Sequence, residues 1–205
     1  MAFHICWGIS ALALILLAAW AGRATRSAAV GILIDNRGRY SLNHMQIVMW
    51  TLLILSSIMG VYLARLFAGE SNLLAFTIPQ ELLILMGISV GSATVAGAAK
   101  SAKDVSGANV ARAGASFAAA GGGKRTIATH FAQVFQEEEG QQADQSIDVT
   151  KFQNFIFTLL TGLAFIVWTW KQANIQGLPP LSKELLWLLG ISHAGYVAGK
   201  LPARS

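Results

Sequence analysis

The sequence predicts an all-α fold, a polytopic bundle of transmembrane helices with five spans and two parallel hairpin repeats. Of the 205 residues, 54% are hydrophobic and only 12% are charged, whereas charged residues make up about 25% of a typical soluble domain. The apolar residues gather in long stretches, and two parts of the chain resemble one another. This composition disfavours a soluble enzyme domain, and the high hydrophobicity excludes disorder of the whole chain.

Five apolar stretches approach the length of a membrane span, which is about 20 helical residues with a range of about 17–25. They cover residues 5–21, 46–68, 82–99, 152–170 and 185–199. The fifth stretch has only 15 residues, so a tilted span and a re-entrant helix shielded by its neighbours are both open. We expect it to span.

The first stretch has two interpretations. Ala19, Trp20 and Ala21 resemble a signal-peptide cleavage site. The residues before this stretch carry no Lys or Arg, although a signal peptide begins with a positively charged region. We therefore expect an uncleaved N-terminal span.

The cations are divided unevenly between the two sides of the membrane. If the loops 22–45 and 100–151 share one side with the tail 200–205, that side holds 12 of the 15 Lys and Arg residues. By the positive-inside rule this side is cytoplasmic, so the N-terminus is outside and the C-terminus is in the cytoplasm. The net charge of +5 is explained by these loops, and we expect no nucleic-acid partner.

An internal repeat organises the chain. Residues 81–89 and 184–192 are identical at seven of nine positions, and each segment follows a loop that contains proline. Both hairpins run in, out and in again, so the repeats are parallel and not inverted. The predicted units are an N-terminal transmembrane anchor (1–22), a first hairpin (40–100), a cytoplasmic linker (101–147) and a second hairpin (148–200).

Several short motifs resemble those of an abundant group of bacterial multi-pass membrane proteins with two helical-hairpin repeats. These motifs are Glu137-Glu138-Glu139-Gly140, Lys151-Phe152-Gln153, Phe157-Thr158-Leu159 and the segment 185–196, which contains Leu-Leu-x-Leu-x-Gly-Ile-Ser. Lys151 stands where that group usually has Arg, and His193-Ala194 where it usually has small residues. The resemblance implies the fold and a bacterial cytoplasmic (inner) membrane. It brings no activity with it.

The second helix of each hairpin is rich in small residues. Gly87 and Gly91, like Gly195 and Gly199, form GxxxG patterns, which let helix backbones approach closely in lipid while hydroxyl groups add hydrogen bonds. These patterns have two interpretations: they pack helices within one protomer, or they line a narrow polar path. The candidate residues are Gly87, Ser89, Gly91, Ser92, Ser192, His193, Gly195 and Gly199.

Ionisable residues add two further hypotheses. His193 lies within the fifth stretch, where an ionisable side chain suggests function, although a histidine bonded to a neighbouring helix is the alternative. Glu81 and Glu184 stand at equivalent outer helix starts, where the helix dipole favours a carboxylate. With Arg65 and Lys171 they can close the outer ends as ion pairs. The alternative is a ring of carboxylates at the mouth of an oligomeric cation pore.

The linker is the remaining non-membrane segment of substantial size. Its basic half can meet anionic lipid headgroups, and residues 126–136 have the period of a short amphipathic helix on the membrane or on a partner. Cys6 is the single cysteine, and no catalytic, cofactor-binding or metal-ligating pattern is present, so we expect no enzyme and no cofactor.

These observations together indicate an integral membrane protein that binds membrane lipids and forms a homo-oligomer. We expect a scaffold or anchor in which residues 101–147 dock a cytoplasmic protein partner. The alternative is a homo-oligomeric ion channel lined by the small-residue helices.

Overall fold

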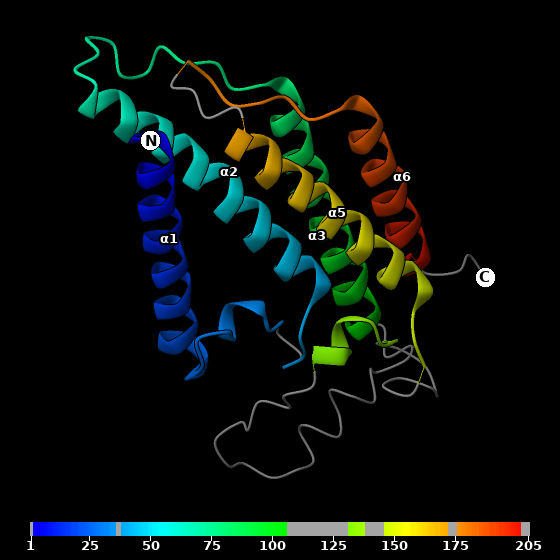
Figure 1. Ribbon diagram of the computed structural model, residues 1–205. Coiled ribbons are helices and arrows are strands. Elements are labelled where there is room, and N and C mark those ends of the chain that lie inside the picture. Colours follow the sequence, from blue (N-terminus) through cyan, green and yellow to red (C-terminus); the bar gives the residue numbers. More distant parts are fainter. Residues whose placement is uncertain (1, 36–37, 106–130, 138–145, 172–175, 202–205) are drawn as a thin grey trace.

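The computed structural model describes residues 2–35, 38–105, 131–137, 146–171 and 176–201. These residues form five α-helices and two short 3-10 helices, without a β-strand (Figure 1). The elements are α1 (Ala2–Arg26), η1 (Gly31–Leu33), α2 (Leu42–Phe67), α3 (Gln80–Val105), η2 (Phe131–Val134), α5 (Val149–Lys171) and α6 (Lys183–Lys200). The predicted all-α class is confirmed.

Four helices are long and apolar enough to cross a membrane: α1, α2, α5 and the part Gln80–Ala102 of α3. They support a membrane location and match the first four predicted spans. Helix α6 has 18 residues and carries Lys183, Glu184 and Lys200 at its ends, so it lacks the long uncharged stretch of the other four. The fifth span stays a prediction.

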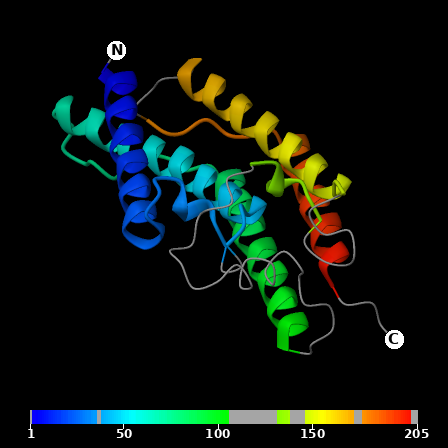
Figure 2. The ribbon, with the colours of Figure 1, turned by 90° about the horizontal axis from the view of Figure 1, so that it is seen from below.

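The helices of the two hairpins form a ring in which each contacts the next. Helix α2 contacts α3, α3 contacts α6, α6 contacts α5, and α5 contacts α2. Helix α1 lies outside this ring against α2, and Figure 2 shows α1 and α6 on opposite sides of the bundle. Helices at equivalent places in the predicted repeat, α2 with α5 and α3 with α6, are therefore in contact. The repeat itself stays a prediction.

The helix termini gather at two opposite ends of the bundle (Figure 1). We call the end that holds the C-termini of α1, α3 and α6 and the N-termini of α2 and α5 the cation-rich end. Two ion pairs tie its segments together, Lys100 with Asp35 and Lys200 with Asp148, each at 3.9 Å. Its described cations are Arg23, Arg26, Arg39, Lys100, Lys151 and Lys200, whereas the opposite end has Arg65, Lys171 and Lys183.

Helix α1 is docked on α2 at a glycine. A β-carbon at Gly60 would lie 2.8 Å from the Cα atom of Trp7, so the two backbones approach this closely only because position 60 has no side chain. The indole N–H of Trp7 donates a buried hydrogen bond to Ser56 Oγ at 3.1 Å. The contact therefore combines a close backbone approach with one polar bond, as expected between helices in lipid.

Replacing Gly60 with alanine should lower the free energy of unfolding by about 1–3 kcal/mol, because the added methyl group would press against the Trp7 backbone. Gly8→Ala in α1 is the matched control, since a β-carbon there would meet no described heavy atom within 4 Å. Alanine is favoured over glycine in a helix by about 1 kcal/mol, so the control should be neutral or stabilising. Thermal unfolding in mild detergent measures both variants, and equal melting temperatures would contradict the contact.

Candidate functional site

The polar candidates of α3 and α6 meet in the contact between these two helices. Ser92 Oγ lies 2.7 Å from His193 Nδ1. Ser89 stands one turn before Ser92, and Ser192 directly precedes His193; Ser89 and Ser192 are buried with His193, which is 1% exposed. The structure thus brings Ser92 and His193 together, and we call this pair, with the buried neighbours Ser89 and Ser192 on the same two helices, the α3–α6 polar contact.

The hydrogen-bond roles in this contact follow from proton counting. Ser92 Oγ also lies within bonding distance of the Ser89 carbonyl oxygen, at 3.0 Å. A hydroxyl group has one proton to donate. If that proton goes to the Ser89 carbonyl, the imidazole Nδ1–H donates to Ser92 Oγ, and Nε2 of His193 is left as an acceptor.

Three polar atoms of the α3–α6 polar contact have no hydrogen-bond partner in the described part of the chain: Ser89 Oγ, Ser192 Oγ and His193 Nε2. Buried polar atoms without a partner cost free energy. The contact therefore has unused hydrogen-bonding capacity, at three atoms that are closed off from solvent.

A second polar contact joins α2 to α5. The side-chain amide of Gln46 donates to Asn154 Oδ1 at 2.9 Å and to Thr158 Oγ1 at 2.6 Å, and all three side chains are fully buried. Sequence analysis did not name this set as a site. One feature of the sequence could have identified it. Asn154 and Thr158 are four residues apart in an apolar stretch, and this spacing places two polar groups on one face of a helix.

The four glycine candidates of α3 and α6 face the outside of the protomer. A β-carbon at Gly87, Gly91, Gly195 or Gly199 would meet no heavy atom of the described residues within 4 Å. Neither GxxxG pattern is therefore packed against another described helix of the same protomer. The outward surface of the bundle around them is apolar, with exposed side chains that include Leu83, Val90, Val95, Trp187 and Ile191.

The charged candidates Arg65, Lys171, Glu81 and Glu184 lie at the end of the bundle opposite the cation-rich end, and their pairing across the helices stays a prediction. Arg65 donates to the Asn72 carbonyl oxygen at 2.9 Å and lies 3.8 Å from the Glu70 carboxylate. Glu81 and Glu184 lie in the first turns of α3 and α6 as predicted, and Lys171 ends α5. Arg65 thus holds the loop that follows its own helix.

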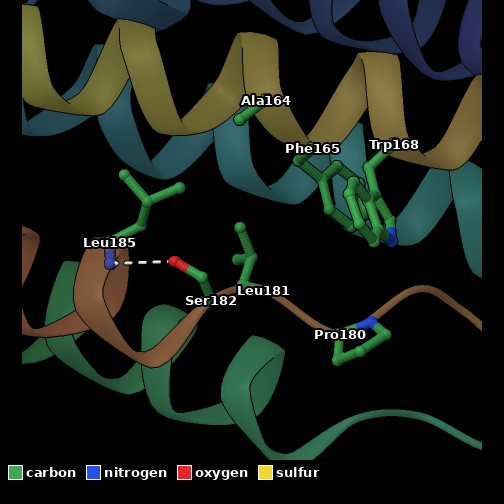
Figure 3. Close-up of a pocket in the computed structure, with 7 residues that line it drawn as sticks. All are labelled: Ala164, Phe165, Trp168, Pro180, Leu181, Ser182 and Leu185. Carbon is green, nitrogen blue, oxygen red and sulfur yellow. Dashed lines mark hydrogen bonds between the residues drawn. The ribbon is translucent and has the colours of Figure 1, made fainter.

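An apolar pocket of about 420 Å³ lies between α5 and the segment that leads into α6 (Figure 3). Ser182 Oγ accepts a hydrogen bond from the Leu185 N–H at 3.2 Å and so caps α6. The lining residues are Ala164, Phe165, Trp168, Pro180, Leu181, Ser182 and Leu185. With a single hydroxyl group already engaged, these residues supply apolar contact and no catalytic group.

The end of the predicted linker is fastened to α5. Phe135 packs edge-on against Phe155 with a ring-centroid distance of 4.9 Å, and the Lys151 ammonium donates to the Gln136 carbonyl oxygen at 2.8 Å. Of the amphipathic helix predicted over 126–136, residues 126–130 lie outside the described residues, and Phe131–Val134 form the 3-10 helix η2. At the other end of the linker, α3 continues to Val105.

The residues that the structure describes contain no group of three or more His, Cys, Asp or Glu side chains placed to hold a metal ion. No protein-family model, no curated protein and no solved structure matches the chain.

Ser92→Ala should lower the free energy of unfolding by about 1–3 kcal/mol, because it leaves the buried Nδ1 of His193 without its partner. Thr94→Ala is the matched control in the same helix, because Thr94 is exposed and its hydroxyl donates to the Val90 carbonyl oxygen of α3 itself. Chemical denaturation in mixed micelles measures both. Equal destabilisation by the two substitutions would show that the α3–α6 polar contact does not hold the helices together.

Proposed function

We propose that the protein is a homo-oligomeric membrane scaffold without catalytic activity, in which residues 101–147 dock a cytoplasmic protein partner. The observation that carries the proposal is the outward direction of Gly87, Gly91, Gly195 and Gly199, none of which touches another part of the described protomer. Glycine in a helix costs about 1 kcal/mol relative to alanine. A close contact with a second protomer would offset this cost, because glycine faces let helices approach in lipid.

The direction of the polar side chains favours a scaffold over a channel. Ser192 shares the glycine side of α6, but Ser89 and His193, which are also buried within the protomer, lie roughly opposite the glycines of their own helices at the spacing of an α-helix. A pore enclosed between protomers at the glycine faces would therefore not be lined by Ser89 or His193. The alternative function, an ion channel, would need a path within one protomer, and the unpartnered atoms of the α3–α6 polar contact are the observation in its favour.

The proposed orientation places the cation-rich end in the cytoplasm and the N-terminus outside, with α6 as the fifth span. The unequal distribution of the described cations between the two ends supports it, by the positive-inside rule. Helix α3 ends and helix α5 begins at the cation-rich end (Figure 1), so a docking role for the segment between them fits this orientation. The resemblance to bacterial membrane proteins favours the bacterial inner membrane.

Gly91→Leu and Gly195→Leu should each reduce the oligomer to smaller species, because leucine at these positions separates the two backbones that glycine brings together. Gly8→Leu is the matched control, since it adds the same side chain at an equally open glycine of α1. Light scattering coupled to size-exclusion chromatography in mild detergent gives the protomer number. An unchanged protomer number in both α3 and α6 variants would contradict assembly through the glycine faces.

Ion flux separates the two functions. The scaffold proposal predicts no flux above that of empty liposomes when the protein is reconstituted. Flux that Ser92→Leu abolishes, with Gly8→Leu unaffected, would instead assign conduction to the α3–α6 polar contact and overturn the scaffold.

A further inference from the structure

A groove lies between α3 and α6 at the end of the bundle opposite the cation-rich end, where both helices begin (Figure 1). Its volume is about 470 Å³, and seven of its ten lining residues are apolar. The three polar ones, Gln80, Glu81 and Lys183, belong to the first turns of the two helices. None of the four glycines of the GxxxG patterns lines the groove, so it is a surface separate from the glycine faces.

The apolar walls of the groove follow from helical spacing. Ile84 and Ile88 of α3 are four residues apart, as are Trp187 and Ile191 of α6, and this spacing places each pair on one face of its helix. Gly190 lies between the two walls, where a β-carbon would be 3.6 Å from Ile88 Cδ1. A longer side chain at position 190 would therefore take up space in the groove.

The mouth of the groove carries one negative and one positive side chain, Glu81 from α3 and Lys183 from α6. Glu81 is partly exposed and Lys183 is exposed, so both are accessible to a ligand. The apolar part of α3 begins at Gln80, which places the two charges at the depth of lipid headgroups. Trp187, one turn further along α6, is 72% exposed, and tryptophan is enriched at this boundary of a membrane.

The dimensions of the groove fit an acyl chain. From Lys183 to Ala194, helix α6 rises about 16 Å at about 1.5 Å per residue, which is roughly half of a hydrocarbon core about 30 Å thick. The groove is therefore about as deep as one leaflet. A helix is about 10–12 Å wide with its side chains, so this length of a second copy's helix would occupy roughly 1,300 Å³ or more. The groove has well under half of that volume.

We propose that the groove binds a zwitterionic phospholipid, with one acyl chain between α3 and α6. The ammonium group of the lipid pairs with Glu81, and its phosphate pairs with Lys183. Charge complementarity selects this occupant, because an anionic lipid such as phosphatidylglycerol brings a phosphate for Lys183 but no cation for Glu81. The proposal rests on the membrane location proposed for α6 and not on the oligomer.

The test is native mass spectrometry of the full chain released from nanodiscs that contain equal amounts of phosphatidylethanolamine and phosphatidylglycerol. Wild-type protein should retain about fivefold more phosphatidylethanolamine, the upper end of what an exposed ion pair contributes. Glu81→Gln should remove this preference, and Glu81→Lys should reverse it. Glu184→Gln is the matched control, because Glu184 lies in the first turn of α6 but does not line the groove.

Gly190→Leu tests the groove without changing a charge. Leucine should fill the space beside Ile88 and lower the retention of both lipids at least fivefold, while the protomer number stays unchanged. Gly195→Leu, at a glycine of the same helix outside the groove, should leave lipid retention unchanged. The two variants therefore separate the lipid site from assembly through the glycine faces.

Three results would each overturn the lipid site. They are equal retention of the two lipids by wild-type protein, an unchanged preference in Glu81→Gln, and a smaller protomer number with unchanged lipid retention in Gly190→Leu. The last result would assign the groove to a second copy of the chain.

Discussion

A polar side chain buried among membrane helices can be bonded only by other groups of the protein, because the surrounding lipid offers no partner. Two such bonds close the ring of helices in this protein. Gln46 joins α2 to Asn154 and Thr158 of α5, and Ser92 of α3 meets His193 of α6. Each bond connects one hairpin to the other, so the relative rotation of the two hairpins is fixed by polar contacts.

The other surfaces of the helices follow from this constraint. With Ser89 and His193 turned inward, the glycines of the same two helices are left on the outward surface, where the proposed second protomer would contact them. Gly60 has the opposite role, because it packs α1 onto the first hairpin within the protomer. Glycines thus pack helices together within the protomer or form part of its outer surface, depending on which face of the helix carries them.

Much of the helical framework could be predicted from the sequence because it depends on local composition. Long apolar stretches identify α1, α2, α3 and α5, and the prolines at 79, 179 and 180 mark the two loops that precede α3 and α6. The helices extend beyond the apolar stretches, since polar residues such as Lys100 and Thr150 continue the same helical backbone. Helix α6 carries charges at both ends, so its composition does not decide whether it spans the membrane.

The contacts between helices depend on rotation and crossing, which no local pattern encodes. The sequence named Ser92 and His193, but not that they meet. The GxxxG patterns were the glycines it singled out, and it did not name Gly60, because a lone glycine without periodicity gives no signal for the close approach of α1. It also did not name Glu70, which lies in the loop after α2 at 3.8 Å from Arg65.

The central claim, that buried polar bonds join the two hairpins, is tested most directly by a double-mutant cycle on Gln46→Leu and Thr158→Val. The free energies of unfolding in micelles should show a favourable coupling of about 0.5–1.5 kcal/mol, the range of polar helix contacts in membranes. A reference cycle of Gln46→Leu with Thr94→Val should be additive, because these residues share no partner. Additive effects of Gln46→Leu and Thr158→Val would contradict the claim.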